Sequence, residues 1–222
     1  MSLLVLVRHG QSVWNLENRF TGWTDVPLTE VGRAEARACG EELRCIPFDI
    51  AFTSKLQRAQ QTLSLILEAA GQTPPVVEDQ ALNERHYGDL QGLNKAETAA
   101  RFGEAQVQRW RRGFEERPPG GESLKDTAER SLAYFYAKIA PELQSGRNVL
   151  ISAHGNTIRA LLMDLDHLSP AQVEKVEIEY CVPIAFSYTD GQFAQVLLPD
   201  CQIVGPSRAA DGLARLSRPQ ND

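Results

Sequence analysis

The chain has 222 residues, 42% of them hydrophobic and 23% charged, and a formal net charge of −6. A chain of this length can bury a sizeable core as one domain, and no apolar run is long enough to span a membrane. The acidic balance argues against nonspecific nucleic-acid binding, so neither a nucleic acid nor a membrane is an expected partner, whereas an anionic small molecule needs only local positive charge.

The first residues and the cysteines indicate the compartment. The chain starts without the basic leader and the small-residue cleavage site of a signal peptide. Its cysteines, Cys39, Cys45, Cys181 and Cys201, form no Cys-x-x-Cys pair. We therefore expect free thiols and a cytoplasmic protein.

The first predicted strand covers residues 3–7 and ends in Arg8, His9 and Gly10. Its five apolar residues are typical of a strand that is buried on both faces. In open α/β folds, ligands bind at the carboxyl edge of such a sheet. Arginine can hold two phosphate oxygens, and a neutral histidine nitrogen can attack phosphorus, so this strand end suits a phosphate. The alternative is a pair of solvated polar residues.

Helices and short strands alternate in the pattern up to residue 112. Capping residues and apolar stripes at helical spacing set the predicted bounds. The predicted elements are a polar loop over 11–23, a helix from Thr29 to about 44, a strand over 48–52, a helix over 55–70 with a Ser54–Gln57 capping box, a strand at 76–77, an irregular charged loop over 82–92, a helix from Asn94 to about 102, and a helix that carries Trp110.

The second half opens with a loop over 113–121 and a long helix from Ser123 to about residue 143. An apolar strand over 148–153 then ends in a second His-Gly step, at His154 and Gly155, and a helix starts at about residue 157. Two strands around the turn at 190–191 are predicted to form a hairpin.

The two His-Gly steps are the strongest internal signal. If their strands are adjacent and parallel, both imidazoles lie at one edge of the sheet. The N-terminus of the helix after Gly155 adds a site for an anion. The chain lacks the glycine-rich nucleotide motifs, and its four histidines lack zinc-like spacing, so a phosphate ligand is favoured over a nucleotide or a metal.

Six segments of the chain match a known family. They are residues 8–15, 18–23, 82–99 (LNERHYGDLQGLNKAETA), 110–112, 118–119 and 153–156. Together they resemble the histidine phosphatase superfamily and, more narrowly, its cofactor-dependent phosphoglycerate mutases. The Arg-His-Gly step alone indicates only the superfamily, whereas the long run over 82–99 favours the mutase branch.

The resemblance implies an α/β fold with a mostly parallel central sheet and helices on both faces. The resemblance extends from the first strand to about Pro183. We expect one domain over residues 1–222, whose polar and weakly patterned tail over 199–222 is either mobile or folded over the site. The implied reaction interconverts 3-phosphoglycerate and 2-phosphoglycerate in glycolysis and gluconeogenesis, with 2,3-bisphosphoglycerate as phosphoryl primer and no metal. Phosphorylated glycerates are then the small-molecule partners, and a homodimer is one of the assemblies left open.

The resemblance also implies a role for each matched residue. His9 carries the phosphoryl group, Arg8, Arg58 and His154 surround that group, and Glu84 exchanges a proton with the substrate hydroxyl. The implied substrate-binding set is Arg8, Gly10, Gln11, Ser12, Asn15, Thr21, Gly22, Arg58, Glu84, Arg85, His86, Tyr87, Lys95, Arg111, Arg112, Gly155 and Asn156.

Two departures from the family pattern stand out. Gln11 replaces the usual Glu, which removes one carboxylate near the nucleophile. Tyr180 and Cys181 replace the usual Thr-Gly, which changes the local packing. Two further functions remain as alternatives: a phosphatase that uses water as acceptor, and a non-catalytic phospholigand-binding module. Lys95 with Arg111 and Arg112 favours the mutase over the phosphatase.

Overall fold

The computed structural model describes residues 1–199. The predicted tail therefore lies, from residue 200 onward, outside the described residues, as does Cys201. Among the other cysteines, Cys39 and Cys181 are free and buried, as expected. Cys45 is disulfide-bonded, so the expectation of four free thiols is wrong at this position.

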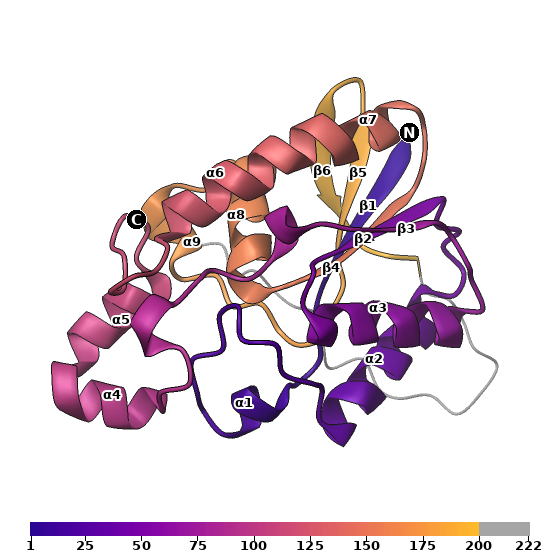
Figure 1. Ribbon diagram of the computed structural model, residues 1–222. Coiled ribbons are helices and arrows are strands. Elements are labelled where there is room, and N and C mark those ends of the chain that lie inside the picture. The colour runs from indigo at the N-terminus through magenta and orange to yellow at the C-terminus, as the bar shows by residue number, and fades with distance from the viewer. Residues whose placement is uncertain (200–222) are drawn as a thin grey trace.

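A central sheet organises the described part of the chain (Figure 1). Its strand order is β3-β2-β4-β1-β5-β6. The first four of these strands run parallel, and β5 and β6 are antiparallel at one edge, so the expected mostly parallel sheet is confirmed. The strands are β1 (Ser2–Arg8), β2 (Ile50–Thr53), β3 (Val76–Glu78), β4 (Val149–Ala153), β5 (Ile184–Thr189) and β6 (Gln192–Val196).

Helices cover both faces of the sheet. One face carries α2 and α3, and the other carries α6 to α8, while α4 and α5 form a separate lobe (Figure 1). The helices are α1 (Val13–Leu16), α2 (Glu30–Leu43), α3 (Gln57–Ala70), α4 (Lys95–Phe102), α5 (Glu104–Arg112), α6 (Leu124–Tyr134), α7 (Ala140–Gln144), α8 (Gly155–Leu165) and α9 (Pro170–Val173), with 3₁₀ turns η1 (Gln80–Leu82) and η2 (Gly88–Leu90) and the π-helical η3 (Phe135–Ile139).

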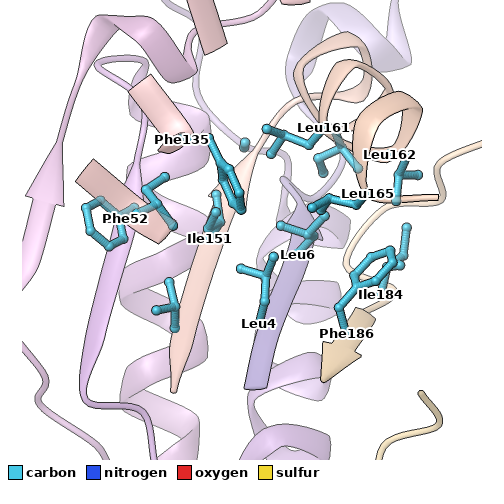
Figure 2. Close-up of a cluster of buried hydrophobic side chains, with 14 of the residues drawn as sticks. Leu4, Leu6, Phe52, Phe135, Ile151, Leu161, Leu162, Leu165, Ile184 and Phe186 are labelled. Carbon is cyan, nitrogen blue, oxygen red and sulfur yellow. The ribbon is translucent and has the colours of Figure 1, made fainter. Parts of the chain in front are cut away.

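Alternate side chains of β1 enter different cores, because successive strand residues point to opposite faces. Leu4 and Leu6 pack with Phe135 and Leu162 under α8 and η3 (Figure 2). The intervening Val5 and Val7 belong to the core under α2 and α3. Both faces of β1 are therefore buried, as its unbroken apolar run predicts, and only its end is available for chemistry.

The predicted helix over 123–143 has an internal interruption. Its middle is the π-helical η3, which lies just before Pro141. Proline has no N–H to donate to the carbonyl four residues earlier, so the helical hydrogen-bond register changes there. This shift joins α6 to α7 without breaking the helical path.

A close backbone contact fixes the loop after β1. A Cβ on Gly10 would lie 2.3 Å from the carbonyl oxygen of Gly32 in α2, so no larger residue fits at position 10 without movement. Thr29 caps α2, and its backbone N–H donates to the carbonyl of Gln11. The start of α2 thus holds the chain that follows His9.

Candidate active site

The pairing of β1 with β4 brings the two His-Gly steps together. Arg8 is in register with Ala153, and the backbone N–H of His9 donates to the Ala153 carbonyl at 3.0 Å. The rings of His9 and His154 lie 5.0 Å apart between centroids. Both residues are buried, with 3% and 0% exposure. The predicted meeting of the two imidazoles at one sheet edge is confirmed.

Hydrogen bonding fixes the tautomer of His9. Its Nδ1 lies 2.7 Å from the Gly10 carbonyl oxygen, which only accepts, so Nδ1 carries the proton. Nε2 is then unprotonated, and its lone pair accepts from Nε of Arg58 at 3.3 Å. Burial, then Arg58 and Arg8, hold the pKa of His9 well below its usual value of 6.5. The ring is therefore neutral at physiological pH, with its unprotonated nitrogen at Nε2.

Arg58, at the start of α3, holds the opposite loop in place. Its Nη2 and Nη1 donate to the carbonyls of Gly22 and Thr24 at 2.7 and 3.0 Å. Burial lowers its pKa to about 10, so it stays charged at pH 7. Gly22 has φ +53°, and a Cβ there would lie 2.1 Å from Oε1 of Gln91. The positive φ and the close Gln91 side chain therefore favour glycine at this turn, where Arg58 binds the backbone.

Ser54 fixes the tautomer of His154. The Ser54 hydroxyl accepts from the Leu56 backbone N–H at 3.2 Å and lies 2.7 Å from Nε2 of His154. The described residues offer its proton no other acceptor, so Ser54 donates to Nε2. Nδ1 of His154 then carries the proton, and it is buried without a partner among the described residues.

Some buried polar side-chain atoms of the described residues have no hydrogen-bond partner. Within residues 1–199 they are Nε of Arg8, Oγ1 of Thr21, Nδ1 of His154 and Nη1 of Arg85. An unpaired buried donor costs about 1–3 kcal/mol. The first three belong to the two strand ends and to the loop that Arg58 holds, so they indicate an anion that accepts from them beside His9.

Glu84 is held from both sides. Its Oε1 accepts from the backbone N–H of Asn156 at 3.1 Å, at the start of α8, and from that of Arg85 at 2.8 Å. Its carbonyl accepts from Nε1 of Trp23 at 2.5 Å and from Nη2 of Arg130 at 2.9 Å. The two backbone N–H groups thus hold the carboxylate in place, and the carbonyl contacts fix the backbone behind it.

Five basic side chains interact electrostatically with one another near Glu84, and we call them the cationic wall. They are Arg8, Lys95, Arg111, Arg112 and Arg159. Burial, then Arg111 and Arg8, lower the pKa of Lys95 to about 8. Arg159 is 5% exposed, and burial lowers its pKa to about 10. A multiply charged anion would relieve the repulsion within this wall.

Three predicted residues in the loop after His9, namely Gln11, Ser12 and Asn15, cap or brace it. Ser12 is the N-cap of α1, and Oδ1 of Asn15 accepts from its backbone N–H and its hydroxyl. The Gln11 amide oxygen accepts from the Thr29 hydroxyl at 2.9 Å, and the Gln11 backbone N–H donates to the carboxylate of Glu35. A carboxylate therefore remains next to position 11, although Gln11 itself lacks one.

Arg85 and His86 face the protein rather than an open site. The fully buried Arg85 guanidinium donates to the carbonyls of Gly113, Glu116 and Glu122, which fixes the loop over 113–122. Nδ1 of His86 accepts from the Gly88 backbone within its own loop. Their side chains brace the site, which leaves the backbone as the part that can face a ligand.

Tyr87 and Asn156 meet at the start of α8. The Asn156 amide donates to the Tyr87 hydroxyl at 3.1 Å, and Arg159 donates to Oδ1 of Asn156 at 3.3 Å. The site therefore includes Arg159, which the sequence reasoning did not select. Its available signal was an arginine four residues after Gly155 on an otherwise apolar helix.

Residues 1–199 offer neither a membrane-spanning helix nor a ready-made metal site. Among these residues no helix combines the length and apolarity that a membrane crossing requires. Within the same range no group of three or more His, Cys, Asp or Glu side chains is placed to hold a metal ion.

Comparison with known families agrees with this geometry. The model of the histidine phosphatase superfamily (branch 1) matches residues 4–200. This chain belongs to the histidine phosphatase superfamily. The match contains both strand ends, Glu84 and the cationic wall, so all parts of the candidate site lie within the superfamily domain.

Relatives within the superfamily include mutases and phosphatases. The chain is 74% identical over 219 residues to a 2,3-bisphosphoglycerate-dependent phosphoglycerate mutase 2 of Gloeobacter violaceus, which covers 97% of this chain and 100% of the relative. It is 54% identical to a 2,3-bisphosphoglycerate-dependent phosphoglycerate mutase of Cytophaga hutchinsonii, over 85% of this chain and 89% of the relative. A mycobacterial glucosyl-3-phosphoglycerate phosphatase structure superposes with TM-score 0.76 at 32% identity, covering 89% of this chain and 98% of that chain.

Proposed function

We propose that this protein is a 2,3-bisphosphoglycerate-dependent phosphoglycerate mutase. It is an isomerase that interconverts 3-phosphoglycerate and 2-phosphoglycerate in glycolysis and gluconeogenesis through a phosphohistidine at His9. The proposal is supported by the 74% identical relative of that name. The structural observation that carries it is the set of unpaired buried donors around the neutral His9, namely Nε of Arg8, Oγ1 of Thr21 and Nδ1 of His154.

The same donors fit a bisphosphorylated primer. Three unpaired donors beside a charged Arg58 suit one phosphoryl group, and the cationic wall suits the remaining charges of the molecule. When bound, 2,3-bisphosphoglycerate supplies the phosphoryl group that loads His9. The residues proposed to contact substrate or primer are those inferred from the family resemblance, with Arg159 added.

The reaction proceeds by two phosphoryl transfers at Nε2 of His9. In the first, the hydroxyl oxygen of a monophosphoglycerate forms a bond to phosphorus while the phosphorus–Nε2 bond breaks. Glu84 takes the hydroxyl proton. Arg8, Arg58 and His154 offset the charge on the equatorial oxygens during transfer. The reverse transfer from the neighbouring position returns a phosphoryl group to His9, and Glu84 returns the proton.

Three residues of the cationic wall favour the mutase over a phosphatase: Lys95, Arg111 and Arg112. A phosphatase of the superfamily would use the same His9 with water as acceptor. The similarity to the 32% identical glucosyl-3-phosphoglycerate phosphatase favours this alternative function. A second anionic group must be held while the two positions of a glycerate exchange places. Five basic residues beside Glu84 can hold such a group, whereas simple hydrolysis does not need it.

The test measures isomerisation and phosphate release together. Purified protein with 3-phosphoglycerate and excess chelator is assayed with and without trace 2,3-bisphosphoglycerate. The proposal expects fast, primer-dependent formation of 2-phosphoglycerate with little free phosphate, and no turnover by His9→Asn. Phosphate release without isomerisation would establish the phosphatase instead. Isomerisation that occurs only when the chelator is omitted would contradict a metal-free reaction.

We propose further that the chain acts as a single domain over residues 1–222. Its partners are phosphorylated glycerates, and a homodimer is its candidate assembly. Its location is the cytoplasm, where these metabolites are turned over. Sedimentation of the purified full chain at several concentrations tests the assembly.

A further inference from the structure

One segment of the chain contacts three arginines of the cationic wall. The Val176 carbonyl accepts from Arg112 at 3.1 Å and from Arg159 at 2.8 Å, and the Ile178 carbonyl accepts from Nη1 of Arg8 at 2.6 Å. This segment over 176–181 follows α9 and leads into β5. It therefore decides how the guanidinium groups on this side of the site are oriented.

Tyr180 adds an aromatic contact to the same wall. The guanidinium carbon of Arg8 lies 3.9 Å from the centroid of the Tyr180 ring. The same ring lies 6.2 Å from the His9 ring, and it is half-buried. An aromatic face at this distance attracts a cation and excludes water from one side of it. No other aromatic ring of the described residues stacks on Arg8.

Two contacts together leave one edge of Arg8 available. The Ile178 carbonyl holds Nη1, the Tyr180 ring covers one face, and Nε is buried without a partner. These contacts fix the rotatable bonds of the long Arg8 side chain. The conformational entropy lost in orienting Nε is therefore lost on folding, before a ligand binds. The free Nε belongs to the donor set beside His9.

The backbone at Cys181 fixes the position of the ring. The Cys181 backbone N–H donates to the Arg8 carbonyl at 3.0 Å, which ties the segment to the end of β1. Cys181 has φ +54°, in the left-handed region that favours glycine. This tight turn places Tyr180 against Arg8 rather than toward solvent.

We propose that Tyr180 is a positioning residue for Arg8 and a cover for phosphorylated His9. It holds Nε of Arg8 toward the phosphoryl oxygens and keeps water away from one side of the phosphorus. In hydrolysis, a water oxygen bonds to phosphorus, the phosphorus–Nε2 bond breaks, and the water protons end on phosphate and solvent. Tyr180 slows this reaction and so favours transfer to the glycerate hydroxyl. Only the preference for transfer to the glycerate hydroxyl rests on the proposed function. The effect of Tyr180 on phosphate binding through Arg8 does not.

The experiment compares Tyr180→Leu and Tyr180→Phe with the wild type. Two readouts are independent of isomerisation: the dissociation constant of inorganic phosphate, and the half-life of labelled phosphohistidine in buffer without substrate. Tyr180→Leu is expected to weaken phosphate binding and to shorten the half-life, each between about twofold and thirtyfold, which is the range of a cation–π contact. Tyr180→Phe keeps the ring and is expected to restore both values.

Control variants separate this role from general packing. Tyr188→Leu removes a half-buried tyrosine from β5 that packs against Phe193, and it should change neither readout. Tyr180→Thr serves as a second ring-free variant if Tyr180→Leu folds poorly. Unchanged phosphate affinity and phosphohistidine half-life in a folded ring-free variant would overturn the inference. If the wild type fails to isomerise, the proposed function fails, but the phosphate-binding comparison still decides the role of Tyr180.

Discussion

The hydroxyl of Ser54 donates to Nε2 of His154 at 2.7 Å across 100 residues of sequence. This bond gives His154 the tautomer in which Nδ1 carries the proton. Since Nδ1 is buried and unpaired, the hydroxyl aims an N–H toward the position where we place the phosphoryl group. If His154 contacts the phosphoryl group as proposed, we expect Ser54 to act on phosphoryl transfer through His154 without touching the substrate.

Without the Ser54 hydroxyl, His154 can turn its ring or change its tautomer, and its Nδ1–H no longer donates to the charged phosphoryl group. Ser54→Ala should therefore slow isomerisation by about 10- to 100-fold. The measurement is kcat for conversion of 3-phosphoglycerate. Ser152→Ala is the matched control, since this serine is equally buried in β4 and donates to the Ala59 carbonyl at 3.0 Å. Equal loss of kcat in both variants would show that buried serines matter here only for packing.

The stability of the fold should fall as pH drops below about 6.5. Burial, followed by Arg58, lowers the pKa of both His9 and His154 well below 6.5. Between 6.5 and the lowered folded pKa values, the unfolded chain binds protons that the folded protein does not. The free energy of unfolding then decreases by up to about 2.7 kcal/mol per pH unit for the two groups. Urea unfolding at a series of pH values measures this slope.

The lowered pKa values of His9 and His154 also predict that activity persists below neutral pH. His9 keeps a free Nε2 lone pair at pH 6, so isomerisation should persist there at near its neutral-pH rate. A control for the stability slope is His9→Asn, which removes one titrating group and should reduce the slope by up to about 1.4 kcal/mol per pH unit. A slope that does not change in this variant would mean that His9 is protonated in the folded protein.

The sheet and the two histidines follow from local sequence. A strand buried on both faces needs an unbroken apolar run, and the polar residues Arg8 and His154 mark where two such runs end. Their meeting requires only that the two strands be parallel neighbours, which is the common arrangement in α/β folds. The family resemblance then supplied Arg58 and Glu84, which no local pattern marks as functional.

Other parts of the site depend on contacts that sequence patterns do not encode. Ser54 matches a capping box, but α3 begins at Gln57 without a side-chain cap, so the predicted cap is wrong and the hydroxyl is used by His154. Arg85 lies within a charged loop, yet its side chain points inward to three carbonyls. Arg159 is an ordinary helix residue by spacing. The partners of Ser54 and Arg85 are remote in sequence, and only the fold brings them near.

The left-handed backbone at Cys181 predicts a separable effect on stability. A side chain at φ +54° costs about 1–2 kcal/mol, which glycine avoids. Cys181→Gly and Cys181→Ala both remove the buried thiol, but only the alanine keeps Cβ. We expect the glycine variant to be more stable than the alanine variant by about 1 kcal/mol in urea unfolding. Greater stability of the alanine variant would show that the turn is unstrained.

Glu177 and Arg112 predict an effect on substrate affinity. The Glu177 carboxylate contacts Nη2 of Arg112 at 2.7 and 2.9 Å, although the glutamate side chain is 74% exposed. Arg112 is proposed to bind an anionic group of the substrate, so Glu177 competes with the substrate for the same donors. Such an exposed pair contributes at most about 1 kcal/mol, so the substrate can displace it.

Glu177→Gln should therefore lower KM for 3-phosphoglycerate by up to about fivefold and leave kcat and the free energy of unfolding nearly unchanged. Steady-state kinetics at saturating primer separates KM from kcat. Glu179→Gln is the control, because it removes the same charge from an exposed position two residues away. A specific decrease at position 177 supports competition for Arg112. An increase in KM would show instead that Glu177 orients Arg112 for the substrate.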